Sequence, residues 1–235
     1  MNPESHPRQL TRNKNLLPLL VFSLVACSST PEKKEIPQEK SLVPMAVQLF
    51  SPQILSADIF VEREVHGYRT KGDITIISPS ALRLDLRTSL DLPLASIVMS
   101  ESKIQYVLYR DKKFFTGKPG PHALDPIFPL IVDSSTLINI LLEKKNPMDQ
   151  CEMADGFLLG CKGNSGQMEY TVDWDKRKTT GPLTGRASKV LLKLPAKQAL
   201  VKFYFNDLQT NVPNAERFLN LEVPDGFKSF SVPER

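Results

Sequence analysis

Cysteines are the side chains whose positions say most about the chemistry of this sequence. The chain has three of them, Cys27, Cys151 and Cys161. A thiol can form a disulfide, bind a metal or carry a covalent modification, and its surroundings decide between these uses. Cys27 ends an apolar run, whereas Cys151 and Cys161 enclose "EMADGFLLG". The first cysteine therefore needs a different explanation from the other two.

Cys151 and Cys161 are predicted to form a structural disulfide across a hairpin. Asp155-Gly156 is a turn signal, and a three-residue loop from Asp155 to Phe157 would place Cys151 directly opposite Cys161. Residues opposed in this way have Cα atoms about 4.5–5.5 Å apart, which a disulfide accepts. A redox-active pair is the alternative, but the spacing is not C-x-x-C and no histidine is near.

Enzymatic chemistry finds little support in the remaining residues. Asp173 and Asp175 would share one face of a strand and could act as acid and base, but the basic run "KRK" follows, which favours a solvated hairpin end. His66 and His122 lack the further ligands that a metal site needs. No phosphate-binding glycine loop, G-x-S-x-G or dinucleotide motif is present. We expect neither an enzyme nor a bound cofactor or metal, and an envelope hydrolase has no supporting constellation.

Cys27 follows a segment that reads as a secretory signal. Arg8, Arg12 and Lys14 precede the apolar run 16–26, which as a helix would span only about 16 Å, roughly half of a bilayer core. The residues just before Cys27, "LVA", resemble a bacterial lipobox. That resemblance implies acyl chains on Cys27, and two or more chains give a stable membrane anchor. An ordinary signal peptide with an incidental cysteine is the alternative.

The rest of the chain divides into a tether and one body. Residues 1–26 are predicted to be the signal peptide, 27–43 the acylated cysteine with a flexible, proline-containing tether, and 44–235 a domain with its own core. The net charge of +4 falls to +2 without the signal, which is not the balance of a nucleic-acid binder. No later segment is apolar over about eighteen residues, as a membrane-spanning helix would be.

Alternation of apolar and polar residues predicts that the body is mainly β. It is clearest in "ALRLDLRTS", where Leu82, Leu84 and Leu86 alternate with charged residues. Similar runs, including "IFVEREVHGYR" followed by "GDITIIS", indicate an antiparallel sheet, preceded by a short amphipathic helix in "AVQLFSPQILSADIF". Midway, Asp133 or Ser134 can cap a helix with Leu137, Ile138, Leu141 and Leu142 on one face. One or two helices are therefore expected to interrupt the strands.

The order of these elements resembles the LolA/LolB group of periplasmic lipoprotein carriers and receptors, and LolB most closely. The segment from Gly67 to Gly117 carries most of the resemblance, and "FLNLEVPDG" resembles a final strand of such proteins. The resemblance implies an incomplete barrel of about eleven antiparallel strands, with inserted helices that plug an apolar cavity. Ser28 differs from the aspartate associated with inner-membrane retention, which favours the periplasmic face of the bacterial outer membrane.

The resemblance also implies which residues bind and deliver a client. The partners would be the membrane, the acyl chains of lipoproteins or another lipid, and a periplasmic LolA-like carrier, with no nucleic acid. The loop "TSLDLPLAS" would expose Leu90 and Leu92 to the membrane, unless these leucines pack inside at a strand end. The predicted cavity lining consists of Leu84, Leu86, Ile97, Tyr106, Leu108, Leu137, Leu141 and Phe203.

A second hypothesis keeps the same anchor and sheet but fills the interior completely. Such a protein would be a structural or accessory lipoprotein of an envelope assembly. The cysteine hairpin and the proline-rich helical segment, which depart from the bacterial receptor, keep this alternative open.

Overall fold

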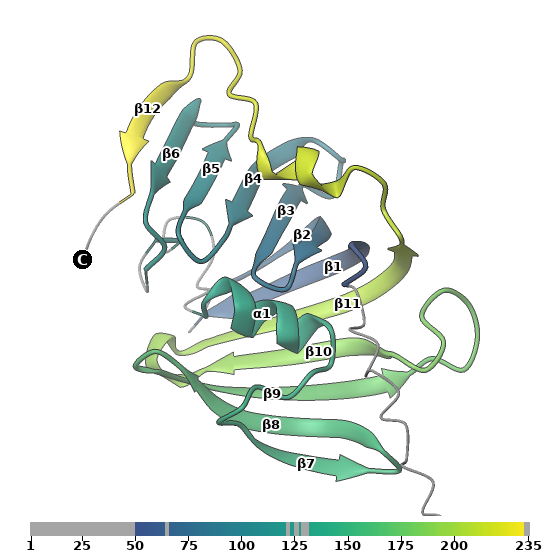
Figure 1. The fold of residues 1–235 in the computed structure, drawn as a ribbon. Helices are drawn as coiled ribbons and strands as arrows, with labels where there is room; N and C mark the ends of the chain where they lie inside the picture. Colours follow the sequence, from purple (N-terminus) through teal and green to yellow (C-terminus); the bar gives the residue numbers. More distant parts are fainter. Residues whose placement is uncertain (1–49, 64–65, 121–122, 125–126, 128–131, 233–235) are drawn as a thin grey trace, which may run out of the picture. The chain divides into compact units, whose positions relative to one another are not determined.

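A single sheet of twelve strands curves around one α-helix in the computed structural model (Figure 1). The structure describes residues 50–63, 66–120, 123–124, 127 and 132–232. The predicted signal peptide, Cys27 and the tether lie outside these residues. Val47–Arg235 forms one compact unit with its own core.

The strands are β1 (Gln53–Arg63), β2 (His66–Ser78), β3 (Ala81–Arg87), β4 (Pro93–Met99), β5 (Ile104–Leu108), β6 (Lys113–Gly117), β7 (Gln150–Ala154), β8 (Phe157–Ser165), β9 (Met168–Arg177), β10 (Ala187–Leu194), β11 (Ala199–Thr210) and β12 (Lys228–Ser231). The helix α1 (Ser134–Leu141) lies between β6 and β7, and two short 3-10 helices are η1 (Pro195–Lys197) and η2 (Ala215–Leu219). Within the described residues no helix is long and apolar enough to cross a membrane.

The sheet is open, because its two outer strands do not pair with each other. Its order is β12-β6-β5-β4-β3-β2-β1-β11-β10-β9-β8-β7. All neighbours are antiparallel except β12, which runs parallel to β6. β1 joins the two halves by pairing with β2 on one side and β11 on the other. The predicted curved antiparallel sheet is confirmed, and it has twelve strands instead of about eleven.

Alternating side chains give the sheet its buried concave face. In β1, Leu55, Ala57, Ile59 and Val61 are buried while the residues between them are partly exposed. Leu82, Leu84 and Leu86 of β3 belong to the same core. Apolar residues at every second position of a strand share one face, so strands such as β1 and β3 each contribute a row to this core.

Helix α1 covers part of the concave face (Figure 1). Asp133 caps it by accepting a hydrogen bond from the backbone N–H of Thr136 at 2.8 Å. Leu137, Ile138 and Leu141 point into the core, as the sequence predicts, and Ile140 joins them. The described residues contain this one α-helix, so it is the regular helical cover of the face.

Polar contacts attach both ends of α1 to the sheet. At the N-terminal end, the Ser134 hydroxyl donates to the carbonyl of Ser80 in the β2–β3 turn at 2.8 Å. At the C-terminal end, Trp174 Nε1 donates to the Ile140 carbonyl at 2.9 Å, and Arg186 Nη2 donates to that of Leu141 at 2.6 Å. The helix is therefore fixed to β9 and to the start of β10 as well as to the β2–β3 turn.

Three local predictions are wrong. The segment 53–58, expected within an amphipathic helix, belongs to strand β1, because β1 pairs along its whole length on both sides; residues 46–49 of the expected helix lie outside the described residues. The runs "IFVEREVHGYR" and "GDITIIS" are not two separate strands, since β2 continues across their junction from His66 to Ser78. Phe218–Gly226 is no final strand: Ala215–Leu219 is a 3-10 helix that contacts β2 and β3, and the last strand begins at Lys228.

The cap of α1 generates a first prediction. Partial burial raises the pKa of Asp133, but hydrogen bonds from Ser135, Ser165 and Thr136 outweigh it and lower that pKa to about 2. Asp133→Ala should therefore reduce the free energy of unfolding by about 1–2 kcal/mol at neutral pH, measured by urea denaturation.

The pH dependence has a definite sign. A carboxyl group with a depressed pKa stabilises the folded state above its ordinary pKa of 3.8, and this contribution is lost as pH falls towards 2. The difference between wild type and Asp133→Ala should therefore shrink between about pH 5 and about pH 2. A constant difference over this range would show that the cap does not act through its charge.

Candidate functional site

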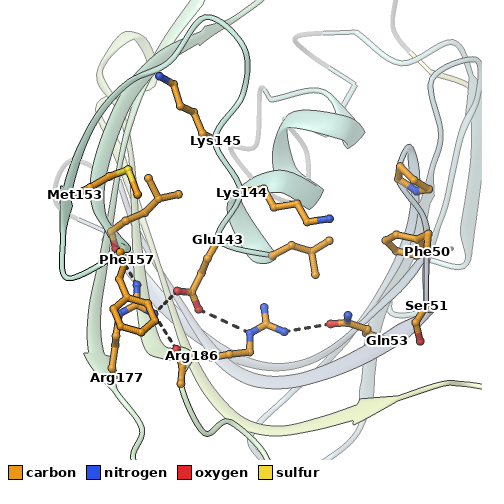
Figure 2. Close-up of a pocket in the computed structure, with 15 residues that line it drawn as sticks. Phe50, Ser51, Gln53, Glu143, Lys144, Lys145, Met153, Phe157, Arg177 and Arg186 are labelled. Carbon is orange, nitrogen blue, oxygen red and sulfur yellow. Dashed lines mark hydrogen bonds and ion pairs between the residues drawn. The ribbon is translucent and has the colours of Figure 1, made fainter. Parts of the chain in front are cut away.

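A cavity of about 890 Å³ opens beside the C-terminal end of α1 (Figure 2). Five parts of the fold contribute to it: the residues around the start of β1, the β2–β3 turn, the segment after α1, the β7–β8 hairpin and the β9–β10 connection. Its lining consists of Phe50, Ser51, Gln53, Pro79, Leu142, Glu143, Lys144, Lys145, Met153, Gly156, Phe157, Leu158, Arg177, Gly185 and Arg186. The volume lies in the range of cavities that hold small ligands, about 300–1,000 Å³.

Apolar side chains enter this cavity from three directions. Phe50 comes from the segment before β1, Leu142 from the end of α1, and Met153 and Phe157 from the β7–β8 hairpin. Leu142 directly follows Leu141, which is buried in the core. The cavity therefore adjoins the core at the end of the helix.

Glu143 organises the polar part of the cavity. It has a left-handed backbone conformation with φ 55°, which turns the chain away from α1. Its carboxylate accepts a hydrogen bond from Arg177 Nη1 at 2.6 Å and from the backbone N–H of Ala187 at 2.8 Å. Arg186 Nε lies 3.7 Å from the same carboxylate. One acid thus holds two guanidinium groups at the wall (Figure 2).

Both arginines have further partners that fix them in place. Arg177 donates to the carbonyls of Leu158 at 2.9 Å and Gly185 at 3.0 Å, and it lies over the ring of Phe157. Arg186 donates to Gln53 Oε1 at 3.1 Å in addition to the Leu141 carbonyl. Burial lowers the pKa of Arg186, and Glu143 opposes that shift. These guanidinium groups serve the structure of the cavity wall.

Lys144 and Lys145 stand at the mouth of the cavity and are exposed. In Figure 2, Lys144 extends from the end of α1 over the space between Glu143 and Phe50, whereas Lys145 lies on the side of Met153. In the sequence they are two basic residues that follow the predicted helix. The fold places both lysines beside the apolar lining of the cavity.

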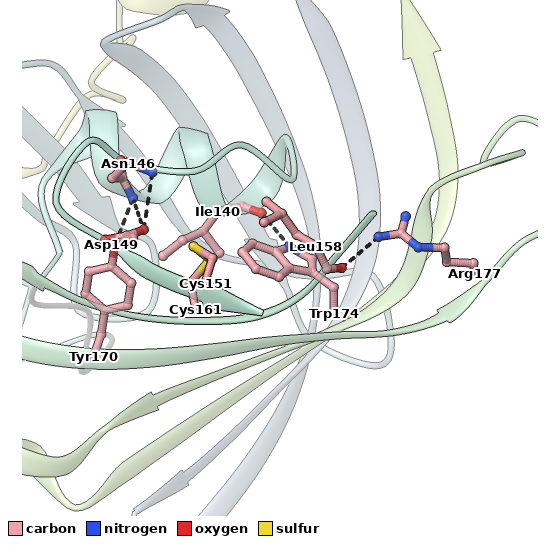
Figure 3. Close-up of a disulfide and its surroundings, with 9 residues drawn as sticks. All are labelled: Ile140, Asn146, Asp149, Cys151, Leu158, Cys161, Tyr170, Trp174 and Arg177. Carbon is pink, nitrogen blue, oxygen red and sulfur yellow. Dashed lines mark hydrogen bonds between the residues drawn. A yellow bond between two sulfur atoms is a disulfide. The ribbon is translucent and has the colours of Figure 1, made fainter. Parts of the chain in front are cut away.

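The β7–β8 hairpin forms one wall of the cavity and carries a disulfide between Cys151 and Cys161 (Figure 3). The two cysteines are opposite each other, as predicted, but the loop has two residues, Asp155 and Gly156, both with positive φ. This turn pairs Ala154 with Phe157, one residue out of the predicted register. A bulge between Glu152 and Met153 restores the register of the cysteines.

A polar cluster beside the disulfide fixes the segment that leads from α1 to β7. Asp149 accepts hydrogen bonds from the Tyr170 hydroxyl at 2.7 Å and from Asn146 Nδ2 at 3.0 Å (Figure 3). Burial and then Asp149 raise the pKa of Tyr170. A Cβ on Gly163 would lie 2.0 Å from Asp149 Oδ1, so this position requires glycine.

Metal-binding groups in this cluster do not form a ligand set. Asp149, Cys151 and Cys161 have donor atoms within 4.8 Å of one another. Both sulfur atoms belong to the disulfide, which leaves Asp149 as the single free donor of the three.

A second cavity, of about 670 Å³, lies at the N-terminal end of α1. Its described lining includes Met99, Ile104 and Leu124 on the apolar side, with Asp133 and Ser165 at the helix start. Asp133 and Ser165 are hydrogen-bonded to each other and so complete the cap instead of facing a ligand.

The cavity lining named from the sequence lies in the packed core. Seven of its eight residues are buried there, and Leu108 packs against them partly exposed: the set is Leu84, Leu86, Ile97, Tyr106, Leu108, Leu137, Leu141 and Phe203. None of the eight lines either of the two cavities. That they contact a ligand stays a prediction.

Leu90 and Leu92 project into solvent. Their exposed fractions are 80% and 60%, so the alternative that they pack inside is not what the structure has. The loop is closed by a hydrogen bond from the Thr88 N–H to the Leu92 carbonyl at 2.9 Å, and Lys71 pairs with Asp91 at 3.0 Å. Contact with a membrane stays a prediction.

This loop and the large cavity lie at opposite ends of β3. Pro79, which lines the cavity, precedes the strand, and Leu90 follows it. Seven strand residues separate the two ends, a distance of roughly 23 Å. The structure therefore does not bring the predicted membrane loop and the cavity together.

Asp173 and Asp175 lie on the solvated side of β9, as expected. Asp173 pairs with Lys193 at 2.9 Å, and Asp175 pairs with Lys189 at 3.5 Å. Each carboxylate therefore has its own cation on β10. His66 begins β2, and His122 lies outside the described residues.

The disulfide generates a second prediction. Replacing both cysteines by serine should lower the free energy of unfolding by about 2–3 kcal/mol, because the bond closes a loop of this size. Tm should fall by about 5–10 °C, and amide hydrogen exchange should quicken between residues 150 and 162. Wild type treated with a reductant serves as the control and should match the variant. Equal Tm values for the oxidised protein and the variant would refute a stabilising role.

Comparisons with known proteins give similar folds at very low sequence identity. No family model matches the chain, and no curated protein matches it. A LolA superfamily protein from Nitrosomonas europaea has a TM-score of 0.49 at 7% identity, covering 72% of this chain and 89% of that one.

Two further solved structures are similar to the same degree. A DUF1329 family protein from Desulfovibrio piger has a TM-score of 0.48 at 6% identity, covering 74% of this chain and 91% of that one. A putative outer membrane lipoprotein-sorting protein domain from Vibrio parahaemolyticus has a TM-score of 0.47 at 7% identity, covering 72% and 92%.

Proposed function

We propose that this protein binds acyl chains in the cavity at the C-terminal end of α1 and acts in the reception or localisation of lipoproteins at the outer membrane. The observation that carries the proposal is the cavity of about 890 Å³ with Phe50, Leu142, Met153 and Phe157 in its lining. Burial of acyl methylenes is non-directional, so this function needs no catalytic residue.

Continuity with the core supports an acyl ligand over a compact polar one. Leu142 lines the cavity, and the preceding Leu141 is buried against the sheet. A chain that passes Leu142 would next meet the inner side of α1 and the concave face. The core residues named from the sequence, including Leu137 and Phe203, would then contact its distal methylenes.

The membrane part of the proposal rests on the sequence and on the exposed loop. Acylated Cys27 would anchor the protein to the outer membrane, with residues 27–43 as a tether. Leu90 and Leu92 are exposed and would enter the lipid surface when the client is delivered. Since this loop is at the far end of β3 from the cavity, uptake from a periplasmic carrier and delivery to the membrane would use different ends of the body.

An accessory module without lipid transfer is the second candidate. The packing of Leu84, Ile97, Tyr106 and Phe203 within the core favours it, because a fully packed interior is what a purely structural protein needs. In that case the cavity beside α1 would be a solvated cleft without a ligand.

Phe157→Asp tests the binding site. A carboxylate in the apolar lining should weaken binding of an acyl ligand by about tenfold or more, since burying a phenylalanine side chain is worth about 1.5–3 kcal/mol. Leu159→Asp is the matched control, because Leu159 lies on the same hairpin, is equally exposed (45% against 44%) and does not line the cavity. Binding can be followed through Trp174, the single tryptophan, whose indole bonds to the end of α1.

Native mass spectrometry of residues 44–235, purified without detergent, gives the parallel readout. Because Val47–Arg235 is one compact unit with its own core, this body is expected to fold without the preceding segment. Retained lipid that is lost in Phe157→Asp but kept in Leu159→Asp supports the proposal. A clean protein mass that persists after addition of acyl ligands would favour the accessory module.

Leu90→Glu tests delivery separately from binding. The change should leave Tm within about 2 °C of wild type because the side chain is exposed, and it should abolish transfer of a lipoprotein into vesicles. Leu90→Met keeps an apolar tip and should retain transfer. If Leu90→Glu transfers its client as fast as wild type, the loop has no part in delivery.

A further inference from the structure

We propose that the ligand of the cavity beside α1 carries an anionic group next to its acyl chain and that Lys144, with Lys145, binds this group. The inference rests on the proposed function, because it names the ligand class of the same site. A carboxylate or a phosphate could be this group, because both are negatively charged.

The charges around the cavity are unbalanced. Four cationic side chains line it, Lys144, Lys145, Arg177 and Arg186, against the single carboxylate of Glu143. An apolar lining with surplus positive charge at its mouth suits an amphiphile whose head is negative. A neutral acyl chain would leave that surplus unused.

The two arginines are not the binding groups. Arg177 is held by Glu143 and by two carbonyls, and Arg186 is held by Gln53, Glu143 and the Leu141 carbonyl. A ligand would have to break these contacts to reach either guanidinium group. The lysines differ, because the side chains of Lys144 and Lys145 have no partner among the described residues.

Lys144 has the better position of the two. Figure 2 shows it extending over the cavity between Glu143 of the polar wall and Phe50 of the apolar lining. Lys145 lies on the other side of the mouth, near Met153. A lysine is a compact charge on a flexible stem, so it can follow a head group at varying depth.

The dipole of α1 would repel an anion at this end of the helix, but contacts at the last turn offset this repulsion. The C-terminal end of a helix carries a partial negative charge on its last carbonyls. In α1 the carbonyls of Ile140 and Leu141 already accept hydrogen bonds from Trp174 and Arg186. The charge of Arg186 beside the last turn therefore opposes the dipole.

The experiment compares ligands that share one acyl chain. Residues 44–235 are titrated with laurate and with the neutral ester monolaurin, each below its micellar concentration. Wild type should bind laurate about five times more tightly than monolaurin, and added salt should reduce this preference. Lauroyl lysophosphatidylglycerol is the third probe: tighter binding than laurate supports the proposal with a phosphate head group, and weaker binding supports it with a carboxylate.

Two double variants locate the charge. Lys144→Gln with Lys145→Gln should abolish the preference for laurate and leave monolaurin binding within about twofold. Lys112→Gln with Lys228→Gln makes the same change of net charge at the β6–β12 edge of the sheet and should keep the preference. Far-ultraviolet circular dichroism and Tm of both variants establish that the body is folded.

The outcomes separate this inference from the proposed function. Equal affinity of wild type for laurate and monolaurin overturns the inference and leaves acyl binding intact. A preference that survives Lys144→Gln with Lys145→Gln also overturns it. Failure to bind any of the three probes removes the proposed function together with the inference.

Discussion

The fold depends on covering the concave face of the sheet with very little helix. Strands β1–β5 and β8–β11 present buried, mostly apolar side chains to this face, and α1 has only eight residues. Burial of Leu137, Ile138 and Leu141 supplies the apolar contact, while Asp133, Trp174 and Arg186 fix the two ends. Because so short a helix cannot extend over the whole face, a cavity opens at each of its ends.

A disulfide and a group of charged contacts stabilise the side of the sheet that ends at β7. The β7–β8 hairpin lies at the outer edge of the sheet, so β7 has a partner on one side only. The disulfide joins its two strands, and Glu143 links the exit of α1 to Arg177 on β9 and to the start of β10. These contacts hold a cavity wall that has little core behind it.

Sequence patterns predicted the parts of the structure that depend on neighbouring residues. Period-two alternation identified β3, and Asp133 with the leucines after it identified α1. The first half of β1, residues 53–58, was misread because its apolar residues suit a helix as well as a strand, and pairing with β2 and β11 decides between them. The turn at Asp155 was misplaced by one residue, since a bulge leaves no mark in the spacing of the cysteines.

The candidate site was harder to predict because it is assembled from distant segments. Phe50, Glu143, Phe157 and Arg186 have no common motif, and only the curvature of the sheet brings them together. Apolar alternation shows that Leu84 or Phe203 faces inward, but not whether it meets another side chain or a cavity. The periodicity that found the core could not distinguish a packed interior from an open one.

An acyl chain that entered the concave face would have to replace the contacts of α1. Displacing Leu137, Ile138, Ile140 and Leu141 from the sheet would cost roughly 6–12 kcal/mol of burial. An acyl chain of about ten methylenes that took their place would contribute on the order of 8 kcal/mol. The end contacts add hydrogen bonds worth about 1 kcal/mol net each, or about 1.5–3 kcal/mol where Asp133 or Arg186 is the charged partner. A single acyl chain could therefore match the burial of the helix but not its end contacts as well, so these contacts decide whether α1 stays in place.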